Sequence, residues 1–106
     1  MTRMENAQPK ITQAAIARRL QAIRDEIGTS NADLARRLGV ARTRFLHWIT
    51  DSESANFPAE EAMVELCDLM PGLTLDFIYR GKLDAIPHAL AIRLEARLQG
   101  IDPDGA

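Results

Sequence analysis

The sequence is poor in cysteine and has no long apolar run, and these shortages exclude several classes of protein. Cys67 is the single cysteine among 106 residues, so no disulfide can form within the chain, and the composition suits a reducing compartment. No apolar stretch approaches the ~20 residues that a membrane-spanning helix needs, and no basic start leads into an apolar core as in a secretory signal. We therefore expect a soluble, cytoplasmic protein that does not bind a membrane.

Residue clusters for metal binding or catalysis are equally scarce. The candidate ligands His47, His88 and Cys67 are isolated from one another and follow no ligand spacing. The glycines form no phosphate-binding loop, and Glu60 and Glu61 lie at an expected helix start, where carboxylates complement the helix dipole. The sequence therefore predicts no enzyme, no metal and no cofactor, and it leaves no length for a separate domain that binds a small-molecule ligand.

Charge is unevenly distributed along a chain of ordinary globular composition. Apolar residues make up 46% of the sequence and charged residues 26%, with a formal net charge of −2. Residues 10–50 hold eight basic and three acidic side chains, a balance of +5, whereas residues 51–106 hold four basic and eleven acidic ones, a balance of −7. Unless this imbalance merely reflects different solvated faces, one pole of the molecule attracts phosphate and the other repels it.

Apolar periodicity and capping residues predict a helical fold. Ile16, Leu20 and Ile23 recur at helical spacing, Gly28 follows as a stop, and Ser30 precedes NADLARRLG as an N-cap. Similar signals predict six helices, at about residues 12–27, 31–38, 42–50, 58–70, 75–81 and 87–99. Further core positions on these helices are Ile27, Met63, Leu66, Cys67 and Met70. No alternating β pattern of useful length occurs, so we expect an all-α fold with a loose arm at 1–10, one domain at 11–81 and a C-terminal helix and tail at 82–106.

The second and third predicted helices have the plan of a helix-turn-helix. They are short, and the turn Gly39-Val40-Ala41 separates them. Phe45, Trp48 and Ile49 follow the i, i+3, i+4 spacing of a buried face. At about 100° per residue, the remaining surface of the third helix presents these side chains: Thr43, His47 and Thr50 outward, Leu46 beside them, and Arg42 and Arg44 on the flanks. A helix of this width fits the major groove of B-DNA.

The stretch NADLARRLGVARTRFLHWIT resembles the helix-turn-helix of the Cro and phage-repressor (XRE) family of DNA-binding transcriptional regulators. The family's characteristic positions hold Leu34, Ala35, Leu38, Gly39, Val40, Phe45 and Trp48. The resemblance covers about residues 11–81 and implies a five-helix, lambda-repressor-like domain, to which residues 82–106 add a C-terminal helix. It also implies sequence-specific binding of double-stranded DNA by a regulator that acts as a repressor, with the helix at 42–50 in the major groove.

The resemblance also implies which residues contact DNA. Carried over by position, the family's contacts fall on Asn31, Arg42, Thr43, Arg44, Leu46, His47 and Thr50. Arg42 can donate to guanine O6 and N7, His47 to a guanine acceptor or a phosphate, and Leu46 can contact a thymine methyl. The sequence departs from the family at Asn31, where many members have Gln, and at Ala41, where many have a Ser or Thr cap. We therefore expect the third helix to begin without a side-chain cap.

Alternative interpretations attach to several of these side chains. His47 could be a solvated surface residue, Trp48 could stack on single-stranded nucleic acid instead of packing in the core, and Arg36 and Arg37 could contact phosphates or be merely solvated. For the whole protein, the alternative to a DNA-binding regulator is a protein-interaction module, such as an antitoxin or a phage accessory factor, that uses the fourth to sixth helices.

The C-terminal helix raises the question of oligomeric state. Leu90, Leu94 and Leu98 lie four residues apart, so this helix either folds back on the domain or pairs with a second copy. A single helix-turn-helix reads only a few base pairs, and regulators of this type commonly bind as dimers on half-sites about 34 Å apart. We therefore expect a homodimer whose interface is the C-terminal segment.

Overall fold

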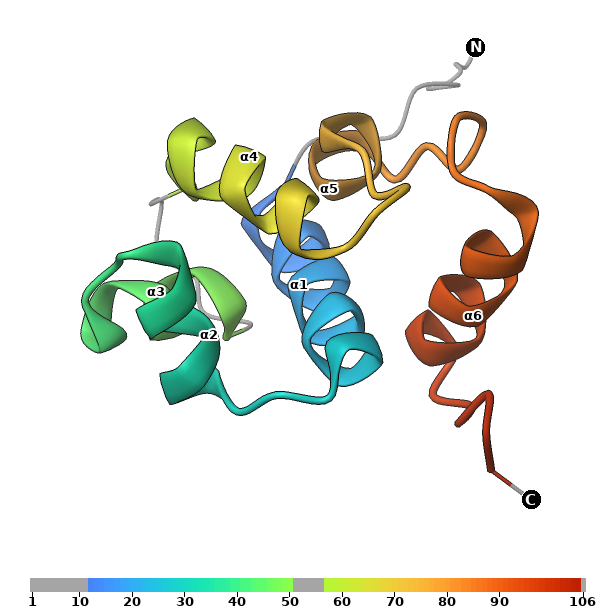
Figure 1. Ribbon diagram of the computed structural model, residues 1–106, viewed down its shortest axis with the longest axis horizontal. Helices are drawn as coiled ribbons and strands as arrows, with labels where there is room; N and C mark the ends of the chain where they lie inside the picture. The colour runs from blue at the N-terminus through green and yellow to red at the C-terminus, as the bar shows by residue number, and fades with distance from the viewer. Residues whose placement is uncertain (1–11, 51–56, 106) are drawn as a thin grey trace, which may run out of the picture.

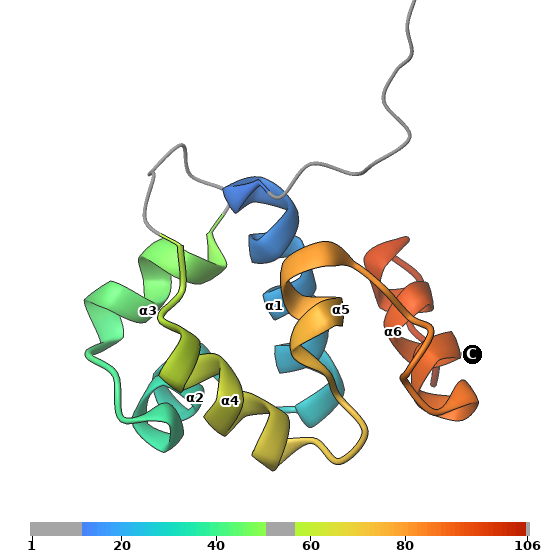
Figure 2. The ribbon, with the colours of Figure 1, turned by 90° about the horizontal axis from the view of Figure 1, so that it is seen from above.

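The computed structural model describes residues 12–50 and 57–105, and within these ranges the chain is all-α, as predicted. Six helices follow one another: α1 (Gln13–Ile27), α2 (Asn31–Leu38), α3 (Arg42–Ile49), α4 (Glu60–Leu69), α5 (Leu75–Arg80) and α6 (His88–Leu98). α1 is central, with α2 and α3 to one side of it and α6 to the other (Figure 1, Figure 2). None of the helices in these ranges has the length and apolarity that crossing a bilayer requires. The predicted arm at 1–10 lies outside the described residues.

Capping residues set most of the helix boundaries. Thr12, Ser30 and Thr74 each accept a hydrogen bond, at 3.1 Å, from the backbone N–H three residues further on, and so begin α1, α2 and α5. Gly39 ends α2 with a φ of 71°, a left-handed conformation that glycine adopts without steric penalty. The predicted boundaries are confirmed to within two residues; α3 ends at Ile49, one residue before the predicted end.

One hydrophobic core joins all six helices. Its largest fully buried side chains are Trp48, Phe45, Phe77, Ile16, Leu20, Ile23, Leu34, Ile49, Met63, Leu66, Ile78 and Leu94. The predicted buried faces of α1 and α3 are therefore confirmed. Ile27 and Cys67 are only half-buried, contrary to expectation, because Ile27 is the last residue of α1 and Cys67 lies at the edge of the buried stripe of α4. Burial raises the pKa of the Cys67 thiol, and the nearby Asp68 carboxylate adds to this shift.

α6 folds back onto α1, which is the first of the two arrangements that its sequence allowed. Leu94 is fully buried between the two helices, Leu90 is half-buried, and Leu98 is 39% exposed. The leucine stripe therefore faces the core in its middle and reaches the surface at its C-terminal end.

An ion-pair network fixes α6 to the end of α1. Glu26 of α1 accepts a hydrogen bond from Nε of Arg93 and another, at 2.7 Å, from Nε of Arg97. The Arg93 guanidinium also donates to both carboxylate oxygens of Asp104, at 3.0 and 2.8 Å. The Glu26 side chain is 12% exposed, so these arginines compensate a charge that is largely removed from water.

Candidate nucleic-acid interface

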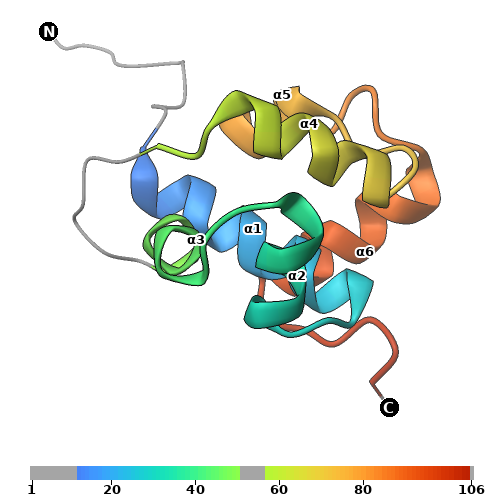
Figure 3. The same ribbon diagram turned by 60° about the vertical axis from the view of Figure 1, so that its left-hand side comes forward.

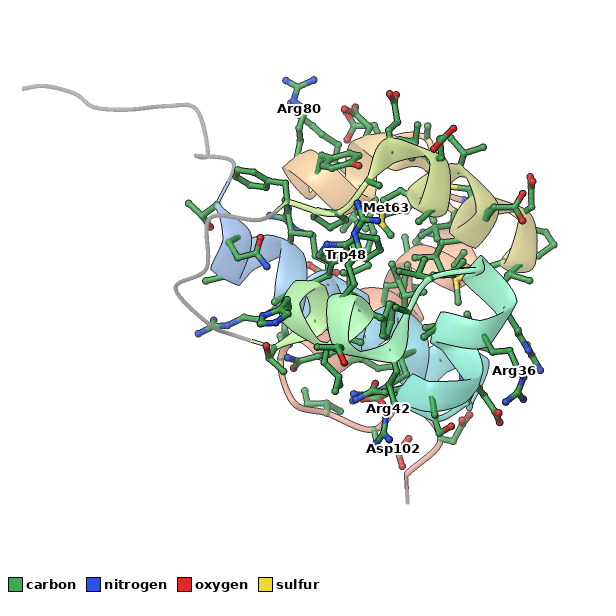
Figure 4. The ribbon with its side chains drawn as sticks, turned by 90° about the vertical axis from the view of Figure 1, so that its left-hand side faces the viewer. Arg36, Arg42, Trp48, Met63, Arg80 and Asp102 are labelled. Atoms are coloured by element: carbon green, nitrogen blue, oxygen red, sulfur yellow. The ribbon has the colours of Figure 1, made fainter. Side chains whose placement is uncertain are left out.

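The position of α3 is determined by three apolar side chains that are buried against α1, α2 and α4. Phe45, Trp48 and Ile49 are at most 1% exposed, and the rings of Phe45 and Trp48 meet edge to face with centroids 6.3 Å apart. Figure 4 shows Trp48 between α3 and α4, where Met63 also lies, with Arg42 on the opposite side of α3. The burial of Trp48 favours its interpretation as a core residue over the stacking alternative. Packing of this face leaves the other face of α3 to solvent.

Five of the seven candidate DNA contacts lie on that solvent face. The exposed side chains are Arg42, Thr43, Arg44, His47 and Thr50. Arg42, Thr43 and His47 have no side-chain hydrogen bond or ion pair within the described ranges. These three side chains can therefore meet a ligand without first breaking a hydrogen bond or ion pair to any residue that the structure describes.

Arg44 and Thr50 are exposed but already have partners in the protein. The guanidinium carbon of Arg44 lies 5.4 Å from the ring centroid of Trp48, close enough for a cation–π interaction. The hydroxyl of Thr50 donates to the carbonyl of Leu46 at 2.7 Å. A ligand would have to compete with these contacts, so the two side chains are less available than Arg42 or His47.

Leu46 and Asn31, the other two candidates, are half-buried. Leu46 packs against the hydrophobic core, so only part of its side chain can reach a ligand. Oδ1 of Asn31 accepts a hydrogen bond from Nη1 of Arg24 at 3.0 Å, which ties the start of α2 to α1 and leaves the amide N–H groups of the side chain for other acceptors. The sequence did not reveal either contact.

The remaining arginines of α1 and α2 differ in their availability. Arg36 is ion-paired with Asp33 one turn earlier, whereas Arg37 is exposed and has no ion pair within the described part of the chain. Arg19 donates to the carbonyl of Ile78 at 3.1 Å, and burial lowers the pKa of its guanidinium. Arg19 therefore has a structural role at the end of α5, and Arg37 adds positive charge to the surface of α2.

The two ends of α3 are held differently. Ala41 provides no side-chain cap at its start, as predicted. At its end, Nε2 of Gln13 donates to the carbonyls of His47 and Trp48, and Nε2 of Gln21 donates to that of Ile49. Sequence reasoning missed these glutamines. The available signal was their spacing of two four-residue steps, which places the two amides along one inclined row of α1.

In the described residues, no three or more His, Cys, Asp or Glu side chains gather as they would around a metal ion. Comparisons of this chain with models of protein families, with functionally characterised proteins and with solved structures find no match.

Proposed function

We propose that this protein is a helix-turn-helix transcriptional regulator of the Cro and phage-repressor kind, with a lambda-repressor-like domain that binds double-stranded DNA sequence-specifically. In this proposal α3 enters the major groove and the protein represses by occupying its site. The observation that carries the proposal is the exposed side of α3, on a helix whose opposite side is buried. Arg42, Thr43 and His47 are exposed there and have no side-chain partner among residues 12–50 and 57–105.

Electrostatics support the same proposal. The start of α3 has no side-chain cap, so its first backbone N–H groups and the positive end of its dipole remain available to an anion. Arg37 and Arg42 add positive charge that no carboxylate in the described ranges neutralises. Binding should therefore weaken steeply as salt is raised, because each neutralised phosphate releases counterions.

The test begins by selecting duplexes that the protein binds from a random DNA pool at a stated salt concentration. Arg42→Ala should then lower the preference for the selected duplex over random duplex by roughly 10- to 100-fold, as expected from the loss of one base contact. Arg80→Ala is the matched control, since Arg80 is also exposed but pairs with Asp76 on α5, far from Arg42 (Figure 4). If Arg42→Ala binds the selected duplex as the unaltered protein does, this assignment of the contacts is wrong.

We also propose that the protein binds DNA as a homodimer through its C-terminal segment. Ile92 and Ile101 are 52% and 56% exposed after α6 has packed on α1, so apolar surface remains for a second copy. Sedimentation of the protein with the selected duplex should give two chains per duplex. A single chain per duplex at saturation would remove the dimer from the proposal.

A protein-interaction module is the second candidate function, and the outer face of α4 favours it. Glu61, Glu65 and Asp68 are exposed at helical spacing, and Val64 among them is 44% exposed. Like charges at these spacings destabilise a helix, and the last turn of α4 has no basic residue to offset them. A cationic protein surface would relieve this repulsion. Tight binding of such a partner, combined with no affinity for any duplex, would favour this function over DNA binding.

A further inference from the structure

All four backbone carbonyls in the last turn of α3 are hydrogen-bonded, three of them by side chains of α1. The carbonyl of Leu46 accepts from the backbone N–H and the hydroxyl of Thr50, at 3.0 and 2.7 Å. Nε2 of Gln13 lies 2.9 Å from the carbonyl oxygen of His47 and 3.4 Å from that of Trp48. Helix ends normally leave four carbonyls unpaired. Here a side chain of α1 takes up two of them.

The last carbonyl of α3, that of Ile49, also accepts a hydrogen bond from a side chain of α1. Nε2 of Gln21 donates to the carbonyl of Ile49 at 2.7 Å. Ala17 lies between the two glutamines, four residues from each on α1. It is fully buried, and its small side chain allows the end of α3 to approach the backbone of α1. The C-terminal end of α3 is therefore attached to one side of α1 by two amides around an alanine.

Gln13 is an unfavourable residue for its position if stability alone is considered. Its side chain is 8% exposed, and its Oε1 atom is buried without a hydrogen-bond partner among the residues that the structure describes. A buried amide oxygen without a partner is destabilising, and an apolar side chain of similar size would avoid that cost. What the glutamine adds is its Nε2 group, and both bonds of that group go to α3.

We infer that Gln13 is a positioning residue for the DNA-reading surface of α3, with Gln21 as its second support. This inference rests on the proposed function. Because no side chain caps α3 at Ala41, the amides of α1 fix the helix at its C-terminal end. Base contacts need placement to within about half an ångström, whereas phosphate contacts tolerate more. Loss of the Gln13 bonds should therefore reduce sequence discrimination and leave general duplex affinity nearly intact.

The test compares Gln13→Met, which cannot donate, with Gln13→Glu, which presents only acceptor atoms to the α3 carbonyls at neutral pH. Arg80→Met is the control, because Arg80 is exposed on α5, away from α3 and from the proposed dimer surface. Gln13→Met should lower the affinity ratio of selected to random duplex about tenfold, the effect of losing one base contact. Affinity for random duplex should stay within about twofold, since it depends on phosphates. Gln13→Glu should have a larger effect on this ratio, and Arg80→Met none.

Amide hydrogen exchange of the free protein provides a readout that needs no DNA. In Gln13→Met the amides of α3 should exchange faster while those of α5 and α6 are unchanged. Global stability should change little, because removal of the unpaired Oε1 offsets the loss of the donor to two α3 carbonyls. An unaltered affinity ratio together with unaltered exchange in α3 would overturn the inference. If no duplex is bound even by the unaltered protein, the proposed function fails, and exchange alone decides whether Gln13 positions α3. If Gln13→Met does not fold, Gln21→Met, at a half-buried position, takes its place in both measurements.

Discussion

Arginines on α3 and α6 have opposite surroundings, although both helices pack against α1. Arg42 on α3 is exposed and has no carboxylate partner in the described ranges, whereas Arg93 and Arg97 on α6 bind Glu26 and Asp104. Figure 3 shows the two helices on different sides of α1, with α3 seen nearly end-on.

This difference separates two uses of the same side chain. On α6, the guanidinium groups neutralise a carboxylate that is 12% exposed, and they fix the helix to the domain. On α3, the buried apolar face and the amides of Gln13 and Gln21 hold the helix in place, so Arg42 is not needed for folding. A surface arginine that has no role in stability can be retained for a ligand anion. Substitutions that break the ion pairs of α6 should therefore lower the free energy of unfolding more than substitution of Arg42 on α3.

The largest effect is expected for Leu94→Ala, which tests whether α6 belongs to the folded body. Leu94 is fully buried against α1, so its truncation should lower the free energy of unfolding by about 2–5 kcal/mol. Urea denaturation measures this change. Ile92→Ala on the same helix, at a position that is 52% exposed, should change stability by less than about 0.5 kcal/mol. Equal stabilities of the two variants would mean that α6 is not part of the cooperative unit.

Glu26→Gln should produce the next largest loss of stability. It removes the charge that Arg93 and Arg97 share and should cost roughly 1.5–3 kcal/mol, the usual range for hydrogen bonds to charged groups. Arg42→Ala should leave the free energy of unfolding within about 0.5 kcal/mol of the unaltered protein. If Arg42→Ala destabilises the protein as much as Glu26→Gln does, the inferred difference in role between the arginines of α3 and α6 is wrong.

Acid should weaken the attachment of α6 in a defined direction. Burial alone would raise the pKa of Glu26, but hydrogen bonds and charge from Arg93 and Arg97 outweigh it and lower the pKa. The pKa of Asp104 is lowered too, chiefly by its hydrogen bonds from Arg93. A carboxylate with a lowered pKa stabilises the folded state above its unfolded pKa, and that contribution is lost as pH falls through the folded value.

Urea denaturation between about pH 5 and pH 3 should therefore show a loss of stability that Glu26→Gln partly removes, since ordinary glutamates titrate in this window. Asp76→Asn is a control on an exposed pair with Arg80, which should leave the pH dependence nearly unchanged. Parallel pH curves for Glu26→Gln and the unaltered protein would show that Glu26 does not contribute to acid sensitivity.

Sequence reasoning located the helices and the buried side of α3 because both depend on local signals. Caps such as Ser30 and the spacing of Phe45, Trp48 and Ile49 act within one or two turns. It did not locate the bonds from Gln13 to α3 or from Arg93 to Glu26, which join residues 34 and 67 positions apart. Which polar side chains meet across helices depends on how the helices pack, and periodicity carries no information on that.

Leu46 illustrates a limit of the helical wheel. The wheel placed it beside the outward row, but the core extends around the flank of α3 and half-buries it. An angular position gives the direction of a side chain, whereas burial also depends on how far the neighbouring helices reach around it. The candidate site is therefore narrower than the sequence predicted, with Arg42, Thr43 and His47 as its most available side chains.

The smallest effect is expected for a substitution at Ala41 that gives the start of α3 the side-chain cap it lacks. Ala41 has φ −60° and ψ 139°, an extended conformation in which a serine hydroxyl can accept from the N–H groups of the first turn. Ala41→Ser should stabilise the protein by about 0.5–1 kcal/mol and raise the melting temperature by a few degrees. Ala59→Ser at the uncapped start of α4 is the matched control and should give a similar gain.

If the free amides of α3 hold a phosphate, Ala41→Ser should weaken duplex binding and Ala59→Ser should not, because the new hydroxyl competes with the phosphate for the same N–H groups. Unchanged duplex affinity in Ala41→Ser would show that the backbone N–H groups at the start of α3 take no part in binding. The contribution of α3 to DNA binding would then come from its side chains alone.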